Sequence, residues 1–118
     1  PDQFFINKTS AGSTTSLGGF GLLVYFEKVG NLATVTFSAS SDSSIMVNSK
    51  ICQLPAGYRP VYNSFFMAAN SNGSVQAVIK LATNGQLTVV NITGATTAIT
   101  ANYTYNVSTF TGASIVNV

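Results

Sequence analysis

Short apolar runs alternate with turn residues along most of the chain, at intervals of about ten residues. The strongest run is Phe20–Lys28, which is followed by Gly30-Asn31 and then by β-branched alternation over Leu32–Ala39. A glycine–asparagine pair between two such runs is typical of a tight hairpin. We therefore predict two antiparallel strands joined by a turn at Gly30-Asn31.

The same pattern predicts further strands along the chain. Asn72-Gly73 and Thr83-Asn84-Gly85 are further turn signals. We expect the remaining strands at 45–47, 50–54, 61–69, 74–82, 86–92, 98–107 and 114–118. The run 98–107 alternates most cleanly, with Ile99, Ala101, Tyr103, Tyr105 and Val107 on one face and Thr100, Asn102, Thr104 and Asn106 on the other.

These patterns predict an all-β fold. Val, Ile, Thr, Phe and Tyr dominate, and no segment has the periodicity of an amphipathic helix. We expect a compact antiparallel, Greek-key-like β-barrel or sandwich, and the pattern does not choose between the two. The expected domain spans residues 18–118. Residues 1–17 are interpreted as a linker or loop that joins a missing upstream region, because 9–17 is rich in Ser, Thr and Gly.

Several predicted strands are apolar on both faces. Leu22 and Val24 alternate with Leu23 and Tyr25, and Phe65 and Phe66 are adjacent. A half-exposed strand alternates apolar with polar residues, so both faces of these strands should be covered. Either loops and a second sheet cover the outer face, or sister subunits pack against it. We expect an oligomer.

Composition narrows the class of protein. Charged residues make up 7% of the chain, against about 25% in an ordinary soluble domain, and 46% of residues are hydrophobic. That balance excludes intrinsic disorder. The net charge is +2, from scattered cations, so we expect no nucleic-acid partner. No apolar stretch approaches the roughly 20 residues of a membrane helix, so we expect no membrane association.

Residues that could perform catalysis are scarce. The chain has no His, and its carboxylates are Asp2, Glu27, Asp42 and the C-terminus. Glycosidases generally need two carboxylates at one bond, and tight metal sites need clustered ligands. Cys52 is the single cysteine, and we expect it to be buried and inert. We therefore predict a protein that is not an enzyme and binds no cofactor or metal.

Four motifs in a fixed order carry a family likeness. They are VGNLATV at 29–35, LPAGYRP at 54–60, NG at 72–73 and TNGQLTV at 83–89. Together they resemble the head domain of receptor-binding and tail-fibre proteins of tailed phages, particularly those that infect lactococci and related Gram-positive bacteria. The likeness covers about half of the chain, and LPAGYRP is its most specific part.

The resemblance implies a homotrimer at the tail tip or baseplate of an extracellular virion. It also implies attachment to upstream tail or baseplate proteins and binding of host cell-wall polysaccharide or another surface glycan. In some related heads the residues that contact the sugar include Trp and His, and this chain has neither. No binding residue is therefore transferred from the family.

The LPAGYRP motif is interpreted first as structural. Pro55 and Pro60 fix the backbone, the Tyr58 ring packs, and Arg59 donates to backbone carbonyls. A sugar site needs an aromatic face and planar polar groups, and recognition usually uses loops on a rigid scaffold. On that basis the candidate saccharide-binding residues are Asp42, Arg59, Tyr62, Asn70 and Asn72. Tyr25, Tyr58, Tyr103 and Tyr105 are further possible aromatic platforms, with packing preferred for Tyr103 and Tyr105.

Three functions remain open from the sequence. The first is a glycan-binding phage head, and the second is a structural trimerisation or baseplate module that binds no sugar. The third, a small polysaccharide-cleaving enzyme, is disfavoured by the missing His and the isolated carboxylates.

Overall fold

The computed structural model describes residues 9–11, 15–16 and 19–107, and every regular element in this part of the chain is a strand. The strands are β1 (Thr9–Ala11), β2 (Thr15–Ser16), β3 (Gly21–Val29), β4 (Leu32–Ser40), β5 (Lys50–Gln53), β6 (Ser64–Ala69), β7 (Gln76–Leu81), β8 (Gln86–Ile92) and β9 (Ala98–Asn106). All pairings are antiparallel. The all-β prediction is confirmed.

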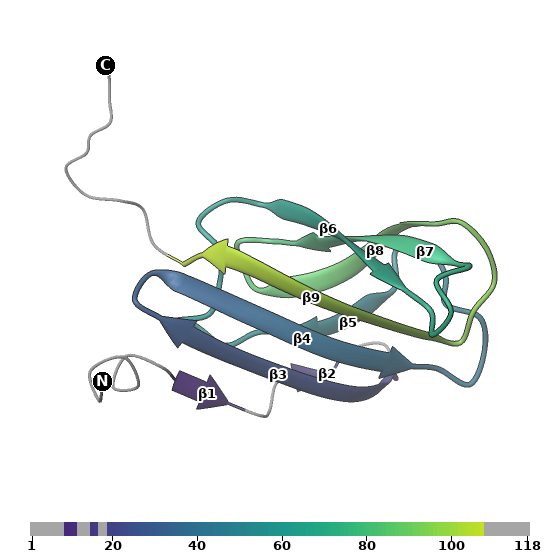
Figure 1. Cartoon of the computed structure of the whole chain (residues 1–118), viewed down its shortest axis with the longest axis horizontal. Helices are drawn as coiled ribbons and strands as arrows, with labels where there is room; N and C mark the ends of the chain where they lie inside the picture. Colours follow the sequence, from purple (N-terminus) through teal and green to yellow (C-terminus); the bar gives the residue numbers. More distant parts are fainter. Residues whose placement is uncertain (1–8, 12–14, 17–18, 108–118) are drawn as a thin grey trace, which may run out of the picture.

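The strands form one sheet in the order β1-β3-β4-β9-β6-β7-β8-β5-β2. β6, β7 and β8 form a meander, and β5 lies beside β8, which is a Greek-key arrangement. In Figure 1, β3, β4 and β9 cross the near side, and the other long strands complete the circuit behind and above them. Ala11 and Thr15 belong to the two edge strands, and the four peptide steps between them span at most about 14 Å. The sheet is therefore a nearly closed barrel.

Several predicted strand boundaries are wrong. Residues 45–47 are a loop, because Ile45 inserts into the core and Asn48 takes a φ of 73°, which ends any extended run. The strand predicted at 61–69 begins only at Ser64, since the chain bends after Pro60. β1 and β2 lie within the segment expected to be a loop. The strand predicted at 114–118 lies outside the described residues.

The core fills the barrel with the inward-facing side chains of successive strands. Its largest fully buried members include Phe26, Phe37, Ile79 and Leu87. Cys52 is also fully buried, as expected. The alternation predicted for β9 is confirmed, because Ile99, Tyr105 and the residues between them in the same phase belong to the core or pack against it.

The LPAGYRP connection is fixed against the barrel end. Leu54 N–H donates to the Gly85 carbonyl at 2.9 Å, and Arg59 Nε donates to the Leu54 carbonyl at 3.0 Å. The Tyr58 ring packs edge-on against Phe26, with 4.6 Å between ring centroids. The structural interpretation of this motif is confirmed for Arg59 and for the Tyr58 ring.

Backbone pairing nearly stops between β6 and β9. The ladder there consists of one residue pair, Ala69 with Thr100. At the other end of the interval, Val61 N–H donates to the Asn106 carbonyl at 3.3 Å. Between these two contacts, β6 and β9 are therefore not joined by backbone hydrogen bonds.

Aromatic side chains close this gap. The Phe66 and Tyr103 rings stack with centroids 4.5 Å apart and planes 8° apart, and Tyr103 also stacks on Tyr105 at 5.8 Å. The Tyr105 hydroxyl donates to the backbone carbonyl of Tyr58 at 2.6 Å. The last strand is thereby joined to the LPAGYRP connection.

We predict that Gly85→Ala lowers the free energy of unfolding by about 3 kcal/mol or more. Gly85 has a φ of 89°, and a Cβ there would lie 2.5 Å from the Leu54 carbonyl oxygen. Gly73→Ala is the matched control, because Gly73 has a φ of 76° but no atom within 4 Å of its Cβ position. It should cost only about 1–2 kcal/mol. Urea unfolding followed by circular dichroism measures both, and equal losses would contradict the close approach.

Candidate functional site

The five candidate saccharide-binding residues lie at opposite ends of the barrel. Asp42 follows the end of β4, near the β6–β7 turn that contains Asn70 and Asn72. Arg59 and Tyr62 lie at the end where β4 begins. β4 has nine residues, so roughly 25 Å separates the two groups. The structure does not bring all five into one site.

At the first end, the asparagines stabilise the hairpin turn. Asn70 Nδ2 donates to Ser74 Oγ at 3.1 Å, and Asn70 Oδ1 accepts from the Val75 N–H at 3.1 Å. Asn72 Oδ1 accepts from the Ser74 N–H at 3.0 Å. Asp42 is exposed in the loop after β4. Both polar atoms of the Asn70 side chain are thus hydrogen-bonded within the turn itself.

At the second end, the two candidates differ in environment. Arg59 is half-buried and its Nε is engaged by the Leu54 carbonyl, as described above. Tyr62 is 72% exposed and lies at the rim of a hollow of about 240 Å³. Ser64 and Asn106 also line this hollow, which we call the small hollow. It lies over the gap between β6 and β9.

Tyr103 and Tyr105, whose rings stack on each other, also line the small hollow. Burial raises the pKa of the Tyr105 hydroxyl well above its usual value of 10.0, and nearby Cys52 and Tyr58 add to the rise. The hydroxyl therefore stays protonated and donates its hydrogen bond at any ordinary pH. Tyr105 is part of the packing, as the sequence favoured.

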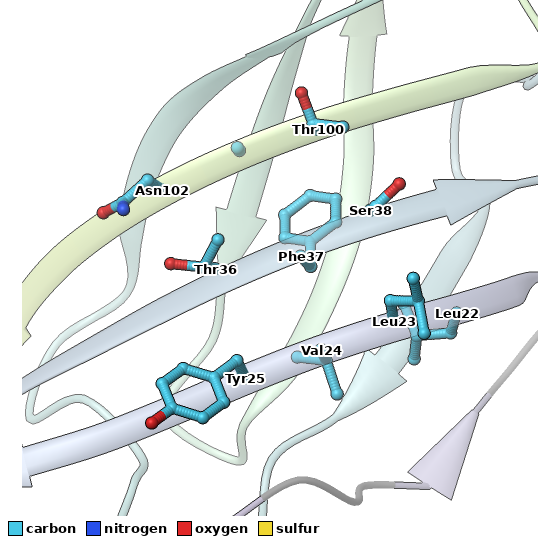
Figure 2. Close-up of a pocket in the computed structure, with 10 residues that line it drawn as sticks. Leu22, Leu23, Val24, Tyr25, Thr36, Phe37, Ser38, Thr100 and Asn102 are labelled. Carbon is cyan, nitrogen blue, oxygen red and sulfur yellow. The ribbon is translucent and has the colours of Figure 1, made fainter. Parts of the chain in front are cut away.

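A larger hollow, of about 570 Å³, lies across β3, β4 and β9. Six of its lining residues form two cross-strand rows, Leu23–Ser38–Thr100 and Tyr25–Thr36–Asn102 (Figure 2). Leu22, Val24, Phe37 and Ala101 also line it. The exposed members lie on the outer face of the barrel, and the small side chains of β4 lie between the larger ones of β3 and Asn102 of β9. We call this the large hollow.

The sequence alone did not identify the large hollow as a site. The sequence pattern places Leu23 and Tyr25 on a second apolar face and offers Tyr25 as a possible aromatic platform. Thr100 and Asn102 were assigned to the polar face of the last strand. Only the pairing of β9 with β4, and of β4 with β3, places these residues together.

Two further findings concern other kinds of site. Among the described residues, no three His, Cys, Asp or Glu side chains gather as a metal ion would require. The described part of the chain also holds no helix that is long and apolar enough to span a membrane.

Comparisons with known proteins identify a shared fold. No protein-family model matches the chain, and no curated protein matches it. Among solved structures, the chain is similar to the crystal structure of the receptor binding protein (gp15) of Listeria phage PSA. The TM-score is 0.59 and the sequence identity is 20%, over 87% of this chain and 69% of that one. The two chains share a fold.

Because the Tyr105 hydroxyl is buried, we predict that the free energy of unfolding falls at alkaline pH. Above about pH 10 the unfolded chain releases this proton while the folded chain keeps it, so stability falls by up to about 1.4 kcal/mol per pH unit. Below pH 10 this group contributes no pH dependence. Tyr105→Phe should reduce the fall of the unfolding free energy with rising pH above about pH 10. It should also lower the unfolding free energy at pH 7 by about 1–3 kcal/mol, because the Tyr58 carbonyl loses its donor. Urea unfolding at pH 7 to 11.5 measures both, and identical alkaline slopes in the two proteins would contradict the assignment.

Proposed function

We propose that this chain is the head domain of a phage receptor-binding protein and that it recognises a saccharide on the host cell surface. The observation that carries the proposal is the fold shared with the Listeria phage receptor binding protein over 87% of the chain. The ordered motifs from residue 29 to residue 89 support the same assignment independently. On this proposal the protein is not an enzyme, and it acts at the tail of the virion.

The chemistry of the surface supports a saccharide as the receptor. The described surface is built mainly from hydroxyl, amide and aromatic groups, and charged residues are sparse. Aromatic rings pack against sugar C–H faces, while hydroxyls and amides bond sugar hydroxyls. Both hollows combine these two kinds of group. A protein that binds a charged polymer usually has a surface patch of the opposite charge, whereas this chain has only five cationic and three acidic residues.

We further propose that three copies assemble into a homotrimer that attaches to upstream tail proteins. Large apolar side chains are exposed on several faces, including Leu32, Met46, Phe65 and Met67. Exposed apolar surface of this extent favours association. Three heads, repeated on one virion, would multiply a weak affinity for each sugar into firm adsorption.

The saccharide proposal predicts how labelled protein binds to cells. Fluorescent full-length chain should bind lactococcal, Listeria or related Gram-positive cells. Binding should survive protease treatment of the cells and fall at least about tenfold after their wall polysaccharide is extracted. Flow cytometry measures the signal, with bovine serum albumin carrying the same label as control. Binding that is lost with protease and kept after extraction would show a protein receptor instead. No binding to any strain would favour a structural module without sugar recognition.

The assembly proposal predicts a species of three times the 12.3 kDa chain mass. Sedimentation equilibrium at micromolar concentration measures this mass. A monomer across the whole concentration range would rule the homotrimer out for this chain.

A further inference from the structure

The large hollow has two walls of different chemistry. On the β3 side stand Leu23 and Tyr25, which are 77% and 52% exposed. On the β9 side stand Thr100 and Asn102, both exposed. Between them, the outward-facing side chains of β4 are the small Thr36 and Ser38, while Phe37 also lines the hollow but belongs to the core. The register therefore forms a trough with an apolar wall and a hydrogen-bonding wall (Figure 2).

Polar side-chain atoms in this trough are available for a ligand. Among the described residues, the side chains of Thr36, Ser38, Thr100 and Asn102 make no hydrogen bond to the protein. The next cross-strand row differs, because Thr34 Oγ1 and Thr104 Oγ1 bond each other at 2.8 Å. That row does not line the hollow. Four polar side chains without a partner among the described residues therefore line the large hollow.

We propose that the large hollow binds an uncharged pyranose unit of a glycan chain, with Tyr25 as the aromatic platform and Asn102 as the main hydrogen-bonding group. This inference rests on the proposed saccharide recognition and assigns its site. A pyranose has an apolar C–H face and a rim of hydroxyls, which match the two walls. The volume of about 570 Å³ falls within the range of small-molecule sites, about 300–1,000 Å³.

The charge of the lining selects the class of sugar. The described residues that line the large hollow include no Asp, Glu, Lys or Arg. An anionic sugar or a phosphate would lose its hydration without gaining a cation, which is unfavourable. A flat apolar partner would likewise bury the polar groups of β4 and β9 without partners. An uncharged ligand that carries its own hydroxyls avoids both losses.

Nuclear magnetic resonance on the ¹⁵N-labelled full chain tests the site. The uncharged probes are the methyl glycosides of glucose, galactose, rhamnose and N-acetylglucosamine, and the anionic probes are glucuronic acid and glycerol phosphate. We expect at least one uncharged probe to shift the amide signals of residues 22–25, 36–38 and 100–102 in a saturable way. The anionic probes should give no saturable shift there.

Two variants and one matched control quantify the contributions. Tyr25→Ala should weaken binding about tenfold, because the sugar loses its aromatic face. Asn102→Ala should weaken it about fivefold through lost hydrogen bonds. Phe65→Ala is the control, since Phe65 is a similarly exposed aromatic residue at 58% but lies outside the large hollow. It should change the affinity for a single glycoside less than twofold.

Other outcomes would overturn the assignment. Saturable shifts around Tyr62 or the β6–β7 turn would place the sugar elsewhere and leave the proposed function intact. Tighter binding of the anionic probes would refute an uncharged ligand. Shifts of the same amides on dilution without sugar would show that this face joins copies of the chain. If no glycoside shifts these amides but the labelled protein still binds cells through their wall polysaccharide, the assigned site is wrong and the proposed function stands. If the labelled protein does not bind the cells either, the proposed function fails as well.

Discussion

The structure depends on how the barrel wall is closed between β6 and β9. One residue pair joins these strands through the backbone, so stacked aromatic rings and the Tyr105–Tyr58 hydrogen bond must hold them together instead. Since Tyr105 donates to the LPAGYRP connection, the same contact fixes the end of the barrel where β5 passes to β6. An unpaired carbonyl at that buried position would be unfavourable, which makes the bond a constraint on the fold and not an addition to it.

This closure also shapes the outer surface. β9 pairs with β4 along its full length and separates from β6, and the two hollows lie on successive stretches of this one strand. The small hollow lies at the gap between β6 and β9, and the large hollow lies where β9 pairs with β4. Both are built largely on paired strands, so the register fixes the backbone positions of their lining residues before any ligand binds. Such preorganisation reduces the entropy that binding would otherwise cost.

A physical reason explains how this chain and the Listeria phage protein share a fold at only 20% sequence identity. A barrel of this kind needs inward-facing apolar residues, glycines at turns and one well-fixed connection, and many sequences meet these needs. The outward-facing positions are free of those demands. Residues such as Tyr25, Thr36 and Asn102 can therefore differ between barrels that share this fold.

The sequence by itself determined most of the strands and the turns between them, although it missed β1 and β2. Period-two alternation identified β9 almost to the residue, because burial of one face requires it. The turn signals on either side of 86–92 identified β8. The prediction of a strand at 45–47 was wrong, since an apolar run of three residues is too short to show a period and only Ile45 is buried. The pairing order, barrel closure and hollows were decided only by the tertiary structure. Strands distant in sequence become neighbours through non-local pairing, and residues such as Tyr25 and Asn102 share a surface only once that register is set.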